Sequence, residues 1–146
     1  MLIVHCGPNS EEKQEESGHQ TKPIFHKSHE PGRVNKPFSD AVEVGNLFFL
    51  TGQIGLDHGT GNMVEGGIEA ETRQTLENIK AVLQYHRLDM KNVVKATVIL
   101  DTISDFAAFN SIYESYLPHK PARTTFAAET LAKNAKIEIE VIAAKD

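Results

Sequence analysis

The run NVVKATVILDT, residues 92–102, most constrains how this chain can fold. It is rich in β-branched residues, and apolar side chains occur at both odd and even positions. Because successive side chains of a strand point to opposite faces of a sheet, such a strand needs cover on both faces. The chain must supply two covering layers, or obtain one of them from another copy of itself.

Two segments, residues 68–88 and residues 102–117, have the apolar periodicity of helices that cover a sheet. Glutamates open the first segment and basic residues close it, as the helix dipole favours. The second begins with capping-box spacing, from Thr102 to Asp105. The stripes at helical spacing are Leu76, Ile79, Leu83 and His86, widened by Val82, in the first segment, and Phe106, Phe109, Tyr113 and Leu117 in the second.

The remaining apolar runs predict strands. Residues 41–44 and 47–50 flank Gly45-Asn46 and predict a hairpin, and a short strand is expected at Met63-Val64. Residues 122–131 and 136–145 are joined by the short segment AKNA, which predicts a second hairpin. Two helices on one face of a mixed sheet give an α+β sandwich. No element remains for the other face, so we expect oligomerisation through the sheet.

Length and composition narrow the class of protein. A chain of 146 residues predicts one domain, and its formal charge of −5 argues against a nucleic-acid partner. A single cysteine, Cys6, and the lack of a long apolar run predict a soluble cytoplasmic protein without membrane association. Residues 1–35 are mostly polar and predict a mobile extension, which leaves residues 36–146 as the folded domain.

Few residues in the sequence are candidates for catalysis or for binding a metal or cofactor. It lacks HExxH, paired CxxC and dinucleotide-binding motifs, so we expect no metal and no cofactor. His26, His29 and Glu30 lie close in sequence, but nothing signals the further ligands that a metal needs, and the segment is expected to be solvated. Arg123 and Glu138 stand out on the last two predicted strands. Spacing alone favours a surface ion pair across a hairpin over a functional site.

Four segments resemble, in order and spacing, the RidA (YjgF) family of enamine/imine deaminases. They are VGNLFFLTGQIGLD, GGIEAETRQTLENIKAVL, VVKATVILDTISDFAAFNSIY and PARTTFAAETLAKNAKIEIEVIA, within residues 36–144. The resemblance implies a chorismate-mutase-like α+β fold and a homotrimer whose sheets line an inner barrel, with sites in the clefts between subunits. It also implies hydrolysis of 2-aminoacrylate and related 2-enamino or 2-imino acids to 2-keto acids and ammonia.

The resemblance also implies roles for single residues. The family's carboxylate-binding arginine corresponds to Arg123 and its acidic residue to Glu138. Its substrate-side glycine corresponds to Gly52, its site serine to Thr51, and its second-helix asparagine to Asn110.

The chain also departs from the family pattern. Phe38 replaces a site tyrosine, Thr125 replaces a cysteine or serine, and Gly55 replaces a proline. The loss of the tyrosine hydroxyl leaves a second interpretation open, a regulatory protein that binds 2-keto acids through Arg123 without turnover. A ribonuclease or translation inhibitor is less compatible with the acidic charge. For a chaperone-like role the sequence offers no test.

Overall fold

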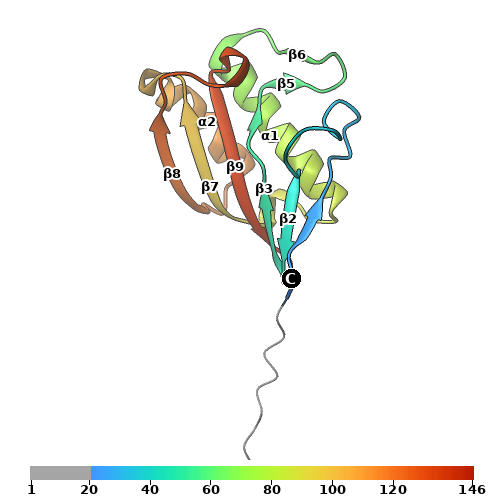
Figure 1. Ribbon diagram of the computed structural model, residues 1–146. Coiled ribbons are helices and arrows are strands. Elements are labelled where there is room, and N and C mark those ends of the chain that lie inside the picture. Colours follow the sequence, from blue (N-terminus) through green and yellow to red (C-terminus); the bar gives the residue numbers. More distant parts are fainter. Residues whose placement is uncertain (1–20) are drawn as a thin grey trace, which may run out of the picture.

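A computed structural model describes residues 21–146, and its central feature is a seven-stranded mixed sheet with two helices on one face (Figure 1). The strand order is β1-β2-β3-β9-β7-β8, with β4 pairing with β9. The helices are α1 (Gly67–Tyr85) and α2 (Phe106–Tyr116). The strands of the sheet are β1 (Ile24–His26), β2 (Ala41–Val44), β3 (Leu47–Leu50), β4 (Gln53–Ile54), β7 (Val93–Leu100), β8 (Ala122–Ala127) and β9 (Ile137–Ala144).

Short elements complete the chain. Strands β5 (Leu56–Asp57) and β6 (Asn62–Met63) form a separate two-stranded ribbon, one residue before the expected strand at Met63-Val64. Three single-turn helices span Met90–Asn92, Ile103–Asp105 and Ala132–Asn134. The predicted α+β class, both helices and the β2–β3 hairpin are confirmed. No helix within residues 21–146 has the length and apolar character needed to cross a bilayer.

The predicted hairpin between the last two strands is wrong. Strand β8 pairs in parallel with β7, and β9 pairs antiparallel with β7 on its other side. Strand β8 ends at Ala127, and residues 128–136 connect it across the end of β7 to β9. Helix α2 carries the chain from β7 to β8, and a helical crossover of this kind produces a parallel pair. A cross-hairpin contact between Arg123 and Glu138 is therefore impossible, because β7 lies between their strands.

The segment before β2 is more ordered than its polar composition predicted. Strand β1 pairs antiparallel with β2, so residues 24–26, which belong to the predicted extension, join the sheet. His26 accounts for part of the difference: its Nε2 lies 2.9 Å from the Glu43 carboxylate, and its ring packs on Phe48 and His86. These contacts offset the entropy that a polar segment loses on ordering. Residues 1–20 of the predicted extension, with Cys6, lie outside the described residues.

The core lies between the sheet and the helices. Along β7, Val93, Ala96, Val98 and Leu100 are buried, and β9 contributes Ile137, Ile139, Val141 and Ala143. Both helices bury residues of the stripes that the sequence predicted. The buried residues of α1 and α2 in this core are Leu76, Ile79, Val82, Leu83, Phe109, Ile112 and Tyr113.

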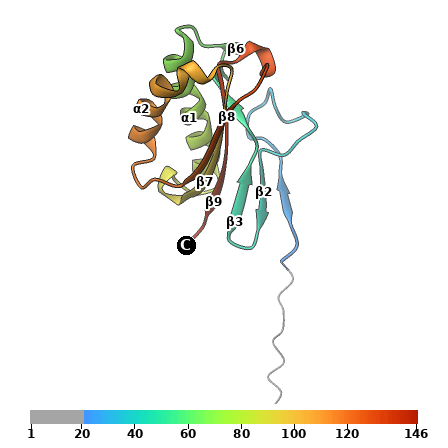
Figure 2. The ribbon, with the colours of Figure 1, turned by 90° about the vertical axis from the view of Figure 1, so that its left-hand side faces the viewer.

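Helices α1 and α2 both lie on one face of the sheet, and within residues 21–146 neither covers the opposite face (Figure 2). Cross-strand pairing places Phe25, Val42, Phe49 and Ile142 in one row on this face, because paired residues project to the same side. Phe25 is 68% exposed and Phe49 is 41% exposed. The expected uncovered apolar face is therefore present in the single chain.

The rings of His26, Phe48 and His86 pack together at the end of α1, and this contact predicts how the stability of the fold depends on pH. Burial lowers the pKa of the His86 imidazole, and the adjacent His26 ring lowers it further, while Glu43 raises it. The unfolded chain then binds more protons below about pH 6.5, so the folded state loses stability as pH falls through that window.

The variant His86→Phe keeps the ring packing and removes the titration. We expect the denaturant midpoint of the wild type to drop between about pH 7.5 and about pH 5.5, and the variant to drop less. Far-UV circular dichroism would measure both midpoints. An equal drop in the two proteins would contradict the assignment to His86.

Candidate functional site

The two residues that the sequence singled out lie on opposite faces of the sheet. Arg123 pairs with Ala96, which is fully buried beneath the helices. Glu138 pairs with Ile99, which lies three residues after Ala96 on β7. Because side chains alternate along a strand, Ile99 and Glu138 project to the face opposite the helices. Because the two side chains project to opposite faces, a single chain does not bring them together.

Arg123 is held by α2. Its Nη1 donates a hydrogen bond of 2.7 Å to Asn110 Oδ1, and Asn110 Nδ2 donates one of 2.8 Å to Glu114. The guanidinium carbon lies 4.8 Å from the centre of the Tyr113 ring and 5.4 Å from that of Phe109. This cation–π packing fixes a planar donor group at the sheet edge, next to a hollow of about 400 Å³ lined by Tyr113, Lys120 and Pro121.

Two hydroxyls near Arg123 have no hydrogen-bond partner among residues 21–146. Thr125 projects to the same face as Arg123, and its Oγ1 is buried without a hydrogen bond to any described residue. The buried Tyr113 hydroxyl also makes no hydrogen bond to any described residue. Burial raises the pKa of Tyr113, while the charge of Arg123 lowers it. Both groups are free to bond to a ligand or to water.

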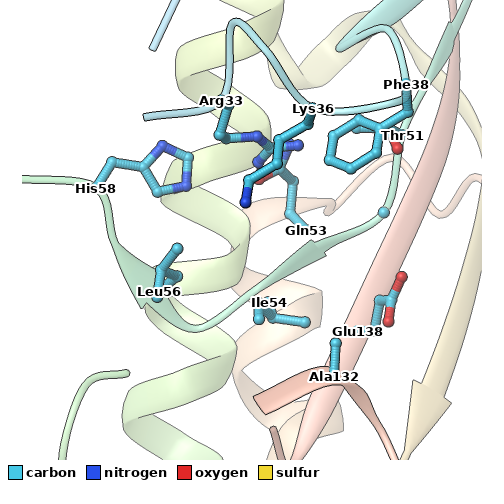
Figure 3. Close-up of a pocket in the computed structure, with 11 residues that line it drawn as sticks. Arg33, Lys36, Phe38, Thr51, Gln53, Ile54, Leu56, His58, Ala132 and Glu138 are labelled. Atoms are coloured by element: carbon cyan, nitrogen blue, oxygen red, sulfur yellow. The ribbon is translucent and has the colours of Figure 1, made fainter. Parts of the chain in front are cut away.

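Glu138 lines a separate cavity of about 330 Å³ (Figure 3). Three other residues from the sequence prediction, Phe38, Thr51 and Gly52, line the same cavity. Figure 3 draws Glu138 on β9 beside the segment that connects β3 to β4. The further lining residues are Arg33, Lys36, Gln53, Ile54, Leu56, His58 and Ala132.

Gly52 is the point at which this wall approaches Glu138. A Cβ built on Gly52 would overlap the carboxylate of Glu138 and lie 3.0 Å from its Cδ. Any side chain at position 52 would therefore force Glu138 to move. The glycine lets the carboxyl group approach the backbone of the cavity wall closely.

The environment of Glu138 favours its protonated form. Burial raises the pKa of the Glu138 carboxyl, and Glu140 on the same sheet face raises it further. Such a group holds a proton more readily than an ordinary glutamate does and is a candidate for proton transfer.

Sequence reasoning missed the cations of this cavity. Arg33 and Lys36 were assigned to, or placed at the border of, the polar extension, yet both line the cavity together with His58. Arg33 Nη2 lies 3.1 Å from Asp40 Oδ1, and Nη1 donates to Gln53 Oε1. Asp40 is the signal that could have located these cations. It is a charged residue directly before a strand, and a carboxylate buried there requires a cationic partner.

The histidine-rich stretch behaves differently from the solvated segment expected. His26 pairs with Glu43, and the His29 ring stacks on Tyr85 with ring centres 4.7 Å apart. Within residues 21–146, no cluster of three or more His, Cys, Asp or Glu side chains is arranged to hold a metal.

Comparison with known proteins identifies the family. A family model described as Endoribonuclease L-PSP matches residues 28–145. The chain is 40% identical over 114 residues to a human protein named 2-iminobutanoate/2-iminopropanoate deaminase. The alignment covers 77% of this chain and 82% of that protein. This chain belongs to the RidA (YjgF) family. A RutC family protein of Pyrococcus horikoshii is 44% identical over 111 residues, 75% of this chain and 88% of that protein.

Solved structures of the RidA family have the same fold. The YjgF protein of Escherichia coli is 31% identical, with a TM-score of 0.76, and the match covers 84% of this chain and 99% of that one. A structure of Escherichia coli TdcF with bound serine is 29% identical, with a TM-score of 0.75, and covers 84% and 98% of the two chains. The RidA resemblance predicted from four sequence segments is thus confirmed.

The approach of Gly52 to Glu138 can be tested without knowledge of the reaction. In Gly52→Ala the new methyl group displaces the carboxyl toward solvent, so we expect the pKa of Glu138 to fall toward its ordinary range. Titration of the Glu138 carboxyl carbon by NMR would measure it. Gly32→Ala is the matched control, because apart from its chain neighbours no heavy atom of the part of the chain that the structure describes lies within 4 Å of a Cβ at Gly32. An unchanged titration in Gly52→Ala would contradict the close approach.

Proposed function

We propose that this protein hydrolyses small 2-imino acids, and their 2-enamino tautomers, to 2-keto acids and ammonia. The observation that carries the proposal is the 40% identity to the human deaminase across a family match of residues 28–145. The geometry adds support, since an arginine braced by an asparagine and a half-buried glutamate are the groups that such a substrate requires.

The proposed site lies between two chains. Because Arg123 and Glu138 project to opposite faces of one sheet, a site that contains both must take each from a different subunit. The bare apolar face supplies a reason for subunits to associate, since Phe25 and Phe49 are exposed there. We propose the homotrimer with an inner barrel of sheets as the assembly that covers this face.

Arg123 positions the substrate in this proposal. A guanidinium can donate two parallel hydrogen bonds to a carboxylate, and Asn110 with the rings of α2 holds its plane. Fixing the carboxylate fixes the imine carbon relative to the catalytic groups of the other subunit. This lowers the entropic part of the barrier.

Glu138 moves the proton. The carboxylate accepts a proton from water as the water oxygen bonds to the imine carbon, giving a tetrahedral carbinolamine. Glu138 returns that proton to the nitrogen. It then takes the hydroxyl proton of the carbinolamine and passes it to the same nitrogen as the C–N bond breaks, so that ammonia leaves and the 2-keto group forms. The raised pKa of Glu138 suits the second step, because the protonated carboxyl has to persist until nitrogen accepts the proton.

The remaining site residues set the surroundings. Thr51 keeps the hydroxyl of the family serine and lines the cavity, while Gly52 leaves room for the Glu138 carboxylate. On the Arg123 side, Thr125 offers a hydroxyl that makes no hydrogen bond to any of residues 21–146. Phe38 presents a half-exposed ring to the cavity without a hydroxyl, and one missing hydrogen bond changes binding by about 0.5–1.5 kcal/mol.

A coupled assay tests the function. Threonine dehydratase would generate 2-iminobutanoate in solution, and release of 2-oxobutanoate would be followed with and without the protein. We expect acceleration by the wild type and about a hundredfold loss of kcat/KM in Arg123→Ala, because a charge-assisted bidentate contact is removed. Arg73→Ala, an exposed change on α1, is the control. Full activity of Arg123→Ala in an intact oligomer would contradict the clamp.

Mixing subunits tests the division of the site between chains. Arg123→Ala and Glu138→Gln should each be inactive alone, since every interface lacks one group. After joint refolding in equal amounts, about a quarter of the interfaces in a cyclic oligomer combine an intact Arg123 with an intact Glu138. We expect about a quarter of the wild-type activity to return. No recovery in mixed oligomers, verified by mass spectrometry, would place both groups in one chain's site and contradict the proposal.

A second candidate function is carboxylate binding without turnover. Phe38 favours it, because the ring lines the cavity but offers no hydroxyl to water or to the imine nitrogen. In that case the coupled assay would give no acceleration, while 2-oxobutanoate would still bind with an affinity that depends on Arg123. The ribonuclease named in the family description receives no support from the charge of −5.

A further inference from the structure

The cavity beside Glu138 continues into a second hollow. The second hollow has a volume of about 170 Å³ and shares Arg33, Lys36, Leu56 and His58 with the first. Lys133 and Glu30 line only the second. Figure 3 shows the Lys36 side chain between Arg33 and Phe38, on the side of the cavity opposite Glu138.

The cations of this double hollow differ in what they already bind. Arg33 is paired with the buried Asp40, and His58 Nδ1 lies 3.4 Å from Glu30 Oε1. Within residues 21–146, Lys36 and Lys133 have no carboxylate within 4.0 Å. Lys133 Nζ makes one contact of 3.4 Å, to the Gly61 carbonyl. Two permanent positive charges are therefore available to an anion.

We propose that these lysines bind a second, distal carboxylate, so that the preferred substrates are 2-imino acids of dicarboxylic amino acids. The inference rests on the proposed function, which assigns the substrate's first carboxylate to Arg123 of another subunit. The imine carbon then lies near Glu138, and the rest of the substrate has to extend into the cavity of Glu138's own chain. A methyl or ethyl group offers no charge to Lys36, whereas a side chain that ends in a carboxylate offers the anion that the two lysines lack.

A pair of substrates of equal size isolates that charge. A flavin amino-acid oxidase would generate the imines of glutamate and of glutamine, which differ in whether the distal group is a carboxylate or a neutral amide. The ratio of kcat/KM for the two imines measures the recognition of distal charge. It is independent of errors in enzyme concentration and of any general loss of activity.

We expect the wild type to prefer the imine of glutamate, and Lys36→Met to reduce that ratio about five- to tenfold, since a partly exposed charged contact is lost. Lys133→Met should reduce the ratio less, because Lys133 lines only the second hollow. Lys91→Met removes an exposed lysine outside both hollows and should leave the ratio unchanged. The wild-type ratio should also decline as salt is added.

Two results would overturn the inference while the deaminase function stands. One is hydrolysis of 2-iminobutanoate by the wild type with no preference for the imine of glutamate. The other is an equal loss with all imines in Lys36→Met, which would make Lys36 part of the common binding site.

A third result separates the inference from the proposed function. If no imine is hydrolysed, the proposed function fails, and calorimetric titration with glutarate and butanoate still tests the lysines. Tighter binding of glutarate that is lost in Lys36→Met would support the distal site. Equal affinities in both proteins would overturn it.

Discussion

The two faces of strand β7 organise both the fold and the candidate site. Ala96 and Val98 pack beneath the helices, while Thr97 and Ile99 project to the bare face. Strands β8 and β9 flank β7, so each inherits this division of faces through its pairing. Arg123 consequently joins the helical layer and Glu138 joins the open face. The separation of the two groups follows from the pleat and requires no special feature of the site.

Two glycines bring the wall of the cavity close to its neighbours. A Cβ on Gly55 would lie 2.8 Å from the Glu71 backbone, so the segment after β4 packs directly on α1. The glycine that stands in place of the family proline therefore packs this loop closely against the helix. Gly52 plays the equivalent role toward Glu138. Glu71 itself accepts a hydrogen bond of 2.7 Å from the Lys136 amide at the entry to β9. Helix, loop and strand thereby hold the wall in one position.

Local patterns predicted the elements of this fold, and pairing over distance was harder to predict. The alternation of side chains along residues 122–127 and 137–144 holds in the structure, because it depends only on backbone geometry, but alternation alone did not tell which face of the sheet Arg123 or Glu138 occupies. The partner of each strand depends on where the strand ends, and β8 ends at Ala127, four residues before the predicted end. The cations of the cavity were missed because composition alone suggested disorder. Their segment is ordered by long-range contacts, which composition cannot express.

Arg33 and Lys36 show how one segment can serve the fold and the ligand separately. The Asp40 side chain is only 2% exposed, so loss of Arg33 would leave a buried carboxylate with little compensation. That cost ties Arg33 to the scaffold, where it also holds the buried amide of Gln53. Lys36 is exposed and forms no ion pair with any carboxylate of residues 21–146, so its charge does not stabilise the fold. Its charge can change between related chains without loss of the fold, and substrate preference can therefore vary at Lys36 while the cavity that surrounds it persists.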